Sequence, residues 1–142
     1  MKNSIYILLT SVTLIACSTS KNIISDSNKS ANANDTIRIV NKDLQFEVII
    51  FDPGFSNWLN SRAYPRGFHS ESYLETKNNI YITEWNIRAL QPQKYNTNLY
   101  DMTINYSPNI KYGYEVNYLI YNYLVYFQNV YKQRLNGYVP IR

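Results

Sequence analysis

Residues 114–131 read "YEVNYLIYNYLVYFQNVY", and the spacing of the apolar side chains in this stretch decides the fold. At about 100° per residue, the apolar residues of 114–135 gather on one side of a helical wheel, and nothing polar enters that side until Arg134. These residues are Val116, Leu119, Ile120, Tyr123, Leu124, Phe127, Val130 and Tyr131. The pattern predicts a long amphipathic helix, which Asn136-Gly137 would end.

The polar residues of this stretch help to separate a membrane helix from a core helix. Glu, Asn and Gln side chains recur at positions 115, 117, 122, 128 and 129, which argues against a lipid-spanning helix. A helix on a membrane surface usually carries Lys or Arg along its polar face, and here only Lys132 and Arg134 occur, both near the end. We therefore expect the apolar side to pack in a protein core.

Three tyrosines lie outside that apolar sector. Tyr114, Tyr118 and Tyr121 are spaced i, i+4 and i+7, so they form one row on another side of the helix. One interpretation is that they pack under a second element while their hydroxyls reach water. The other is that they form a platform for a glycan or a peptide. The row is the candidate ligand-binding surface of the sequence.

The remaining patterns predict an α+β domain over residues 36–142. "TIRIV" (36–40) and "LQFEVIIF" (44–51) favour a β-hairpin, and alternation near 100–106 indicates a third strand. Ser70 is a candidate N-cap for a second long helix that reaches about Leu90, although residues 80–85 also favour a strand. We expect a small antiparallel sheet of about three strands packed with two long helices.

The N-terminus carries the features of an exported lipoprotein. Residues 1–16 combine a short basic start with an apolar run that is too short to span a bilayer, which is typical of a signal peptide. The run ends in "LIAC" (14–17), which resembles the bacterial lipobox, and the resemblance implies lipidation of Cys17. Residues 17–35 are Ser/Asn-rich and predict a flexible tether after that cysteine. The expected location is the outer membrane, facing the periplasm.

The composition narrows the possible functions. Cys17 is the single cysteine, so no intramolecular disulfide can form. The formal net charge is +4, but the basic residues are scattered, which argues against nucleic-acid binding. His69 is the single histidine, and without further ligands it predicts no metal site. No nucleophile motif or phosphate-binding loop occurs, so we expect no cofactor and no catalytic residue.

These observations favour a non-enzymatic, membrane-anchored protein with an envelope protein or a glycan as its partner. One alternative is a glycan- or peptidoglycan-binding module that uses Tyr and Trp surfaces. Another is a hydrolase that uses two of the chain's carboxylates, although the spacing selects no pair.

Three long blocks of the chain resemble a family of small bacterial lipoproteins of unknown function. The blocks are "DPGFSNWL" (52–59), "YLETKNNIYITEWNIRALQPQKYNTNLY" (73–100) and "INYSPNIKYGYEVNYLIYNYLVYFQ" (104–128). The similarity covers about 37–135, and it implies a lipid anchor. It implies no activity, ligand or catalytic residue.

Overall fold

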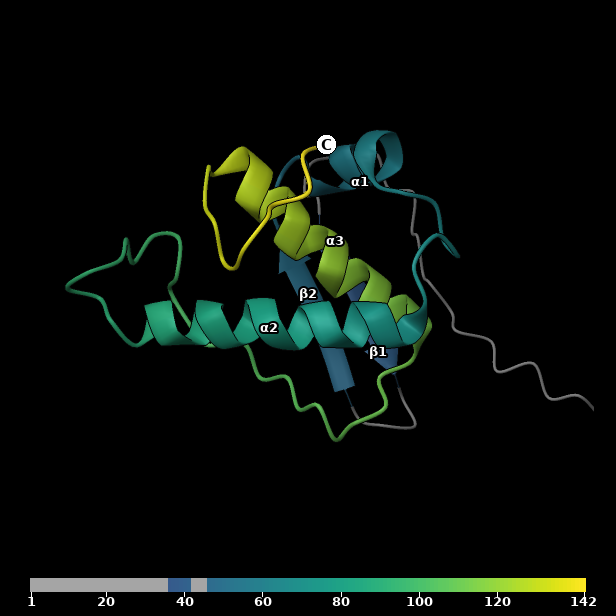
Figure 1. The fold of residues 1–142 in the computed structure, drawn as a ribbon, viewed down its shortest axis with the longest axis horizontal. Coiled ribbons are helices and arrows are strands. Elements are labelled where there is room, and N and C mark those ends of the chain that lie inside the picture. The colour runs from purple at the N-terminus through teal and green to yellow at the C-terminus, as the bar shows by residue number, and fades with distance from the viewer. Residues whose placement is uncertain (1–35, 42–45) are drawn as a thin grey trace, which may run out of the picture.

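The computed structural model describes residues 36–41 and 46–142 of the 142-residue chain. The elements are β1 (Thr36–Asn41), β2 (Phe46–Phe51), α1 (Phe55–Arg62), α2 (Glu71–Ala89) and α3 (Tyr114–Val130) (Figure 1). The predicted signal peptide, Cys17 and the tether lie outside the described residues.

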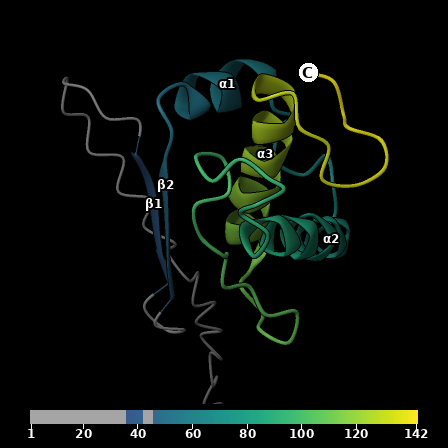
Figure 2. The ribbon, with the colours of Figure 1, turned by 90° about the vertical axis from the view of Figure 1, so that its left-hand side faces the viewer.

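The body of the protein is built around α3. Helix α2 packs across α3, and α1 packs against α3 near its other end. The two strands pair antiparallel, with Ile37 opposite Ile50, and form a two-stranded hairpin. Figure 2 shows α3 in the middle, with the hairpin on one side and α2 on the other. Ile50 is the described hairpin side chain that joins the buried core.

The predicted α+β fold, with about three strands packed on two long helices, is wrong. Three helices form the body of the described residues, which is therefore helical, and residues 100–106 form no strand. Side chains of α2 explain the missing strand, because they take up the backbone groups that a ladder would need. Asn86 bonds both the N–H of Ile104 (2.7 Å) and its carbonyl (2.9 Å), and the Trp85 indole donates to the Met102 carbonyl (2.9 Å).

Helix α2 runs without a break through residues 80–85, so the helical prediction for that segment is confirmed. The N-cap prediction is also confirmed, since the Ser70 hydroxyl accepts a hydrogen bond from the Tyr73 N–H. The buried side chains of α2 follow a helical spacing, and they are Leu74, Asn78, Tyr81, Ile82 and Trp85. Burial of this stripe against α3 therefore outweighs the strand preference of the β-branched and aromatic residues.

Helix α3 is buried on nearly every side, whereas the sequence predicted one buried face. Twelve of its seventeen residues are buried, and three of these carry amides. Each amide donates to the carbonyl four residues earlier, with lengths of 3.0 Å from Asn117, 2.8 Å from Asn122 and 3.0 Å from Gln128. Because the helix satisfies these donors by itself, polar residues can be buried around it at little cost.

The end of α3 also differs from the prediction. The helix ends at Val130, and Lys132 has a positive φ of 53°, so the chain turns away before Asn136-Gly137. Val130 and Tyr131 were expected in the core, but they are 46% and 37% exposed. Val130 is the last residue of the helix and Tyr131 is its C-cap, so the buried face predicted for residues 114–135 stops before them.

In the described part of the chain, no helix has both the length and the apolar character that a membrane crossing requires.

Candidate binding pocket

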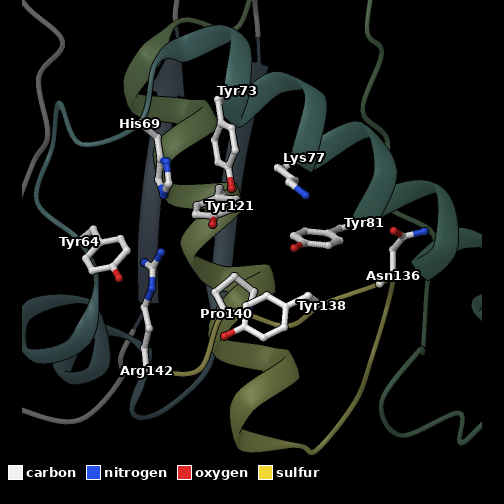
Figure 3. A pocket seen from close by; sticks show the side chains of 11 residues that line it. Tyr64, His69, Tyr73, Lys77, Tyr81, Tyr121, Asn136, Tyr138, Pro140 and Arg142 are labelled. Carbon is white, nitrogen blue, oxygen red and sulfur yellow. The ribbon is translucent and has the colours of Figure 1, made fainter.

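A cavity of about 310 Å³ opens between α2, α3, the loop that precedes α2 and the segment after Leu135. Figure 3 shows the side chains that surround it. The loop contributes Tyr64 and His69, α2 contributes Tyr73, Lys77 and Tyr81, α3 contributes Tyr121, and residues 136–142 contribute among others Asn136, Tyr138 and Arg142. A volume at the lower end of the usual range for ligand pockets, ~300–1,000 Å³, is suited to a small molecule.

Local helical geometry places the α2 side of the wall. Tyr73, Lys77 and Tyr81 follow one another at four-residue intervals, so they lie in a row along α2. His69 stacks on the first of these rings, with centroids 4.2 Å apart and planes 10° apart. Tyr121 of α3 meets the same histidine edge-on at 5.4 Å. The helix packing therefore brings the loop, α2 and α3 to one aromatic wall.

Buried polar atoms without hydrogen-bond partners cluster at this pocket. Four such side-chain atoms occur among the described residues, and three belong to residues that line the cavity: His69 Nε2, the Tyr121 hydroxyl and Arg142 Nε. The fourth is Asn78 Oδ1, which lies in the interior between α2 and α3. Each unsatisfied buried group costs about 1–3 kcal/mol. The structure therefore concentrates this cost at one site.

Two cations also border the cavity. The Arg142 guanidinium carbon lies 3.7 Å from the centroid of the Tyr64 ring, which is a close cation–π contact. The Lys77 ammonium lies 5.9 Å from the ring of Tyr73 and 6.0 Å from that of Tyr81. Neither cation has a carboxylate at ion-pair distance within the described residues, whose salt bridges use other cations.

The pocket keeps its titratable rings neutral. Burial, together with the nearby positive charge of Arg142, lowers the pKa of His69. Burial raises the pKa of Tyr121, and the Tyr73 hydroxyl beside it raises it further. Burial likewise raises the pKa of Tyr81. At neutral pH the imidazole of His69 and the hydroxyls of Tyr81 and Tyr121 are therefore uncharged, and the cationic side chains of Arg142 and Lys77 border the same cavity.

The three tyrosines predicted as a ligand platform have separate roles in the structure. The Tyr114 hydroxyl accepts a hydrogen bond from the Gly67 N–H (2.7 Å), and the Tyr118 hydroxyl donates to the Tyr64 carbonyl (2.8 Å). Both therefore hold the loop before α2 onto α3. Tyr121 is 1% exposed, and it is the one member of the row that lines the cavity.

Sequence reasoning did not single out the cationic part of the site. Lys77 lies between Tyr73 and Tyr81 at helical spacing, and that spacing alone could have grouped the three. Arg142 gave no comparable signal, because only the path of the last residues brings it beside Tyr64. His69 was singled out only as too isolated for a metal site, and its ring forms part of the pocket wall from the loop before α2.

The pocket has no acidic lining residue among the described residues. Two glutamates of α2 are used in ion pairs: Glu75 with Lys111, and Glu84 with Arg88. Across residues 46–142, no group of three or more His, Cys, Asp or Glu side chains could hold a metal ion.

A comparison with protein-family models matches residues 5–140 to a family of unknown function, DUF6146. The chain belongs to this family. The DUF6146 match covers both the pocket-forming helices and the N-terminal segment with Cys17, and it confirms the predicted resemblance at the level of a family without an assigned function. Arg142 lies beyond the matched residues. Comparisons with curated proteins and with solved structures found no match.

Proposed function

We propose that this DUF6146 protein is a non-catalytic binding domain of the cell envelope and that the pocket between α2, α3 and residues 136–142 is its ligand site. The observation that carries the proposal is the clustering of three unpartnered buried polar atoms, on His69, Tyr121 and Arg142, around one cavity. These atoms are covered in this structure, so a ligand that displaced the side chains over them and supplied partners would recover part of the cost of burying them.

The chemistry of the lining favours binding over catalysis. The wall combines aromatic faces with a few convergent polar groups, which is the usual composition of a small-molecule site. A carboxylate-based hydrolase needs two acidic groups on opposite sides of the scissile bond, and no observation favours such a pair at this pocket.

The envelope location rests on the sequence. The "LIAC" run (14–17) and the polar stretch after it support a lipid on Cys17 and a tether that holds the domain away from the bilayer. We propose the outer membrane, with the domain facing the periplasm, where an envelope glycan or protein could supply the ligand.

Palmitate labelling tests the anchor. Wild-type protein is expected to take up the label and to fractionate with membranes, whereas Cys17→Ser takes up none. Cys17→Ser protein could remain membrane-bound through an unprocessed signal peptide, so the label decides rather than the fractionation. A wild-type chain without label would rule out lipidation.

Binding is tested with the lipidated full chain in nanodiscs, screened against envelope glycan fragments and peptides while turnover is monitored. We expect saturable binding without product formation. Asn136→Trp is the blocking variant, because Asn136 lines the pocket from an exposed position, and it should weaken binding at least tenfold. Asn98→Trp, an exposed site outside the lining, is the matched control. Turnover, or binding that survives Asn136→Trp, would contradict the proposal.

A further inference from the structure

We propose that the ligand of the pocket is a small organic acid, with its carboxylate held by Arg142 and its ring placed against the tyrosine faces. This inference rests on the proposed binding function and adds the chemical class of the ligand. It is carried by the charge of the lining, by the geometry of Arg142 and by the size of the cavity.

The charge of the lining selects an anion. Arg142 and Lys77 border the cavity without a carboxylate partner among the described residues, and no acidic side chain lines the pocket there. Figure 3 shows their charged groups on either side of Tyr121, both turned toward the cavity. Uncompensated cations with low-dielectric walls focus a positive potential into a cleft. A cationic ligand would be repelled there, whereas an anion would neutralise the site.

The Arg142 guanidinium has hydrogen-bonding capacity that the described residues do not use. One face of the guanidinium is occupied by the Tyr64 ring at 3.7 Å, and Nη1 makes only a long contact of 3.5 Å with Asn122 Oδ1. Nε has no partner. A guanidinium binds a carboxylate through two parallel N–H donors in its own plane. Since Nε is covered in this structure, the side chain has to slide on the Tyr64 ring as the ligand enters.

The remaining wall suits a ring. Tyr73 of α2 borders the cavity, and the exposed ring of Tyr138 borders it from the last segment, whereas Tyr81 is 1% exposed and offers little surface to a ligand. Aromatic faces pack against the flat C–H face of a sugar or against another aromatic ring, and tyrosine hydroxyls add polar contacts. A volume of about 310 Å³ holds a molecule of one or two rings rather than a long chain. A uronic acid and an aromatic acid both meet these requirements.

Paired probes test the inference on the lipidated full chain in nanodiscs, by calorimetry at pH 7. Glucuronate is compared with glucose, in which a hydroxymethyl group replaces the carboxylate, and 4-hydroxybenzoate is compared with phenol, in which hydrogen replaces it. Inorganic phosphate is the probe for an anion without a ring. We expect one acid to bind at least tenfold more tightly than its neutral counterpart, and the pair that shows the difference identifies a sugar acid or an aromatic acid.

Variants assign the effect to Arg142. Arg142→Gln should abolish the preference for the acid, and Arg142→Lys should restore only part of it, since an ammonium cannot form the paired bonds. Arg134→Gln, an exposed arginine outside the lining, removes the same charge elsewhere and should leave the preference intact. A preference that survives Arg142→Gln would overturn the inference.

His69 supplies an independent readout, because it is the single histidine and gives one set of imidazole signals in NMR spectra. A bound carboxylate beside Arg142 should raise the pKa of His69, since it offsets the positive charge that lowers it. A neutral ring adds burial but no negative charge, so it should not raise the pKa of His69.

The outcomes separate this inference from the proposed function. If glucose or phenol binds as tightly as its acid, and Asn136→Trp abolishes that binding, the binding function stands and the acid preference is wrong. If no acid binds at millimolar concentration, or if phosphate binds more tightly than either carboxylate, the inference is likewise wrong. If Asn136→Trp weakens the binding of none of the fragments and probes, both the proposed function and the acid preference are wrong.

Discussion

Tyr121→Phe is expected to stabilise the folded protein, although removal of a buried hydroxyl usually does the opposite. The Tyr121 hydroxyl is buried without a hydrogen bond of ordinary geometry, and a polar neighbour is the Tyr73 hydroxyl, which raises its pKa further than burial alone does. Phenylalanine keeps the ring, and with it the edge contacts to His69 (5.4 Å) and Tyr73 (5.9 Å) and the stacking with Tyr81 (6.4 Å). The change therefore removes an unsatisfied oxygen and little packing.

The magnitude follows from the hydroxyl's surroundings. An unpaired buried hydroxyl costs about 1–3 kcal/mol, and the Tyr73 hydroxyl lies beside this one and offers a weak partner, so the lower value applies. We expect Tyr121→Phe to raise the free energy of unfolding by about 1 kcal/mol. Two matched variants on α3 should lower it. Tyr118→Phe loses the bond to the Tyr64 carbonyl, worth about 1 kcal/mol. Tyr126→Phe deprives the buried Asp52 carboxylate of a donor at 2.8 Å, worth about 2 kcal/mol.

Urea unfolding at pH 7, followed by fluorescence, measures the free energy of unfolding of all three variants. The m-value of each variant is fitted as a free parameter. The same chemical change should give opposite signs at positions 121 and 118, with unchanged m-values. If Tyr121→Phe lowers the free energy of unfolding by more than about 0.5 kcal/mol, the Tyr121 hydroxyl of the wild type has a partner in solution. This result would refute the argument that unsatisfied groups lie at the pocket. If Tyr118→Phe is neutral, the loop before α2 does not depend on that bond.

Three further predictions concern the rest of the fold. Burial raises the pKa of Tyr106 to about 12, whereas the value in the unfolded chain is about 10. The contribution of Tyr106 to stability is therefore present below about pH 10 and is lost as the pH rises toward 12. Between pH 8 and pH 11, the urea midpoint should fall less in Tyr106→Phe than in wild type. Gly54→Ala should cost about 1–2 kcal/mol, because φ is +112° and the new Cβ would lie 3.3 Å from the Tyr126 hydroxyl; an unchanged melting temperature would contradict this. Arg88→Met keeps the apolar stem but loses the ion pair with Glu84 and the hydrogen bonds to the Tyr100 hydroxyl and the Arg134 carbonyl, so thermal unfolding should show a loss of about 2 kcal/mol, and equal stability would show that this set of contacts is unimportant.

Local signals in the sequence predicted the helices well. Ser70 caps α2 as expected, and the buried stripe of that helix follows from its spacing. These features depend on neighbours within one or two turns, so a single stretch of sequence contains the information. The early end of α3 at Val130 was missed, because the positive φ of Lys132 carries no comparable signal.

Strand prediction near 100–106 failed for a different reason. The alternation there is real, but a strand also needs a partner for its backbone groups. Asn86 and Trp85, from a segment about 18 residues earlier, take those groups instead. Alternation describes which side chains are apolar, and it does not determine what the backbone will bind.

The sequence by itself determined the two long helical segments, the family of the chain and the features that favour export and lipidation at Cys17. Only the tertiary structure decided that α3 is buried nearly all round and that its tyrosine row divides between loop anchoring and a pocket wall. It also brought Arg142 over Tyr64 and beside Tyr121, from positions far apart in the chain. The physical reason is that capping and periodicity act between near neighbours, whereas a pocket is formed by side chains whose proximity depends on how whole helices pack.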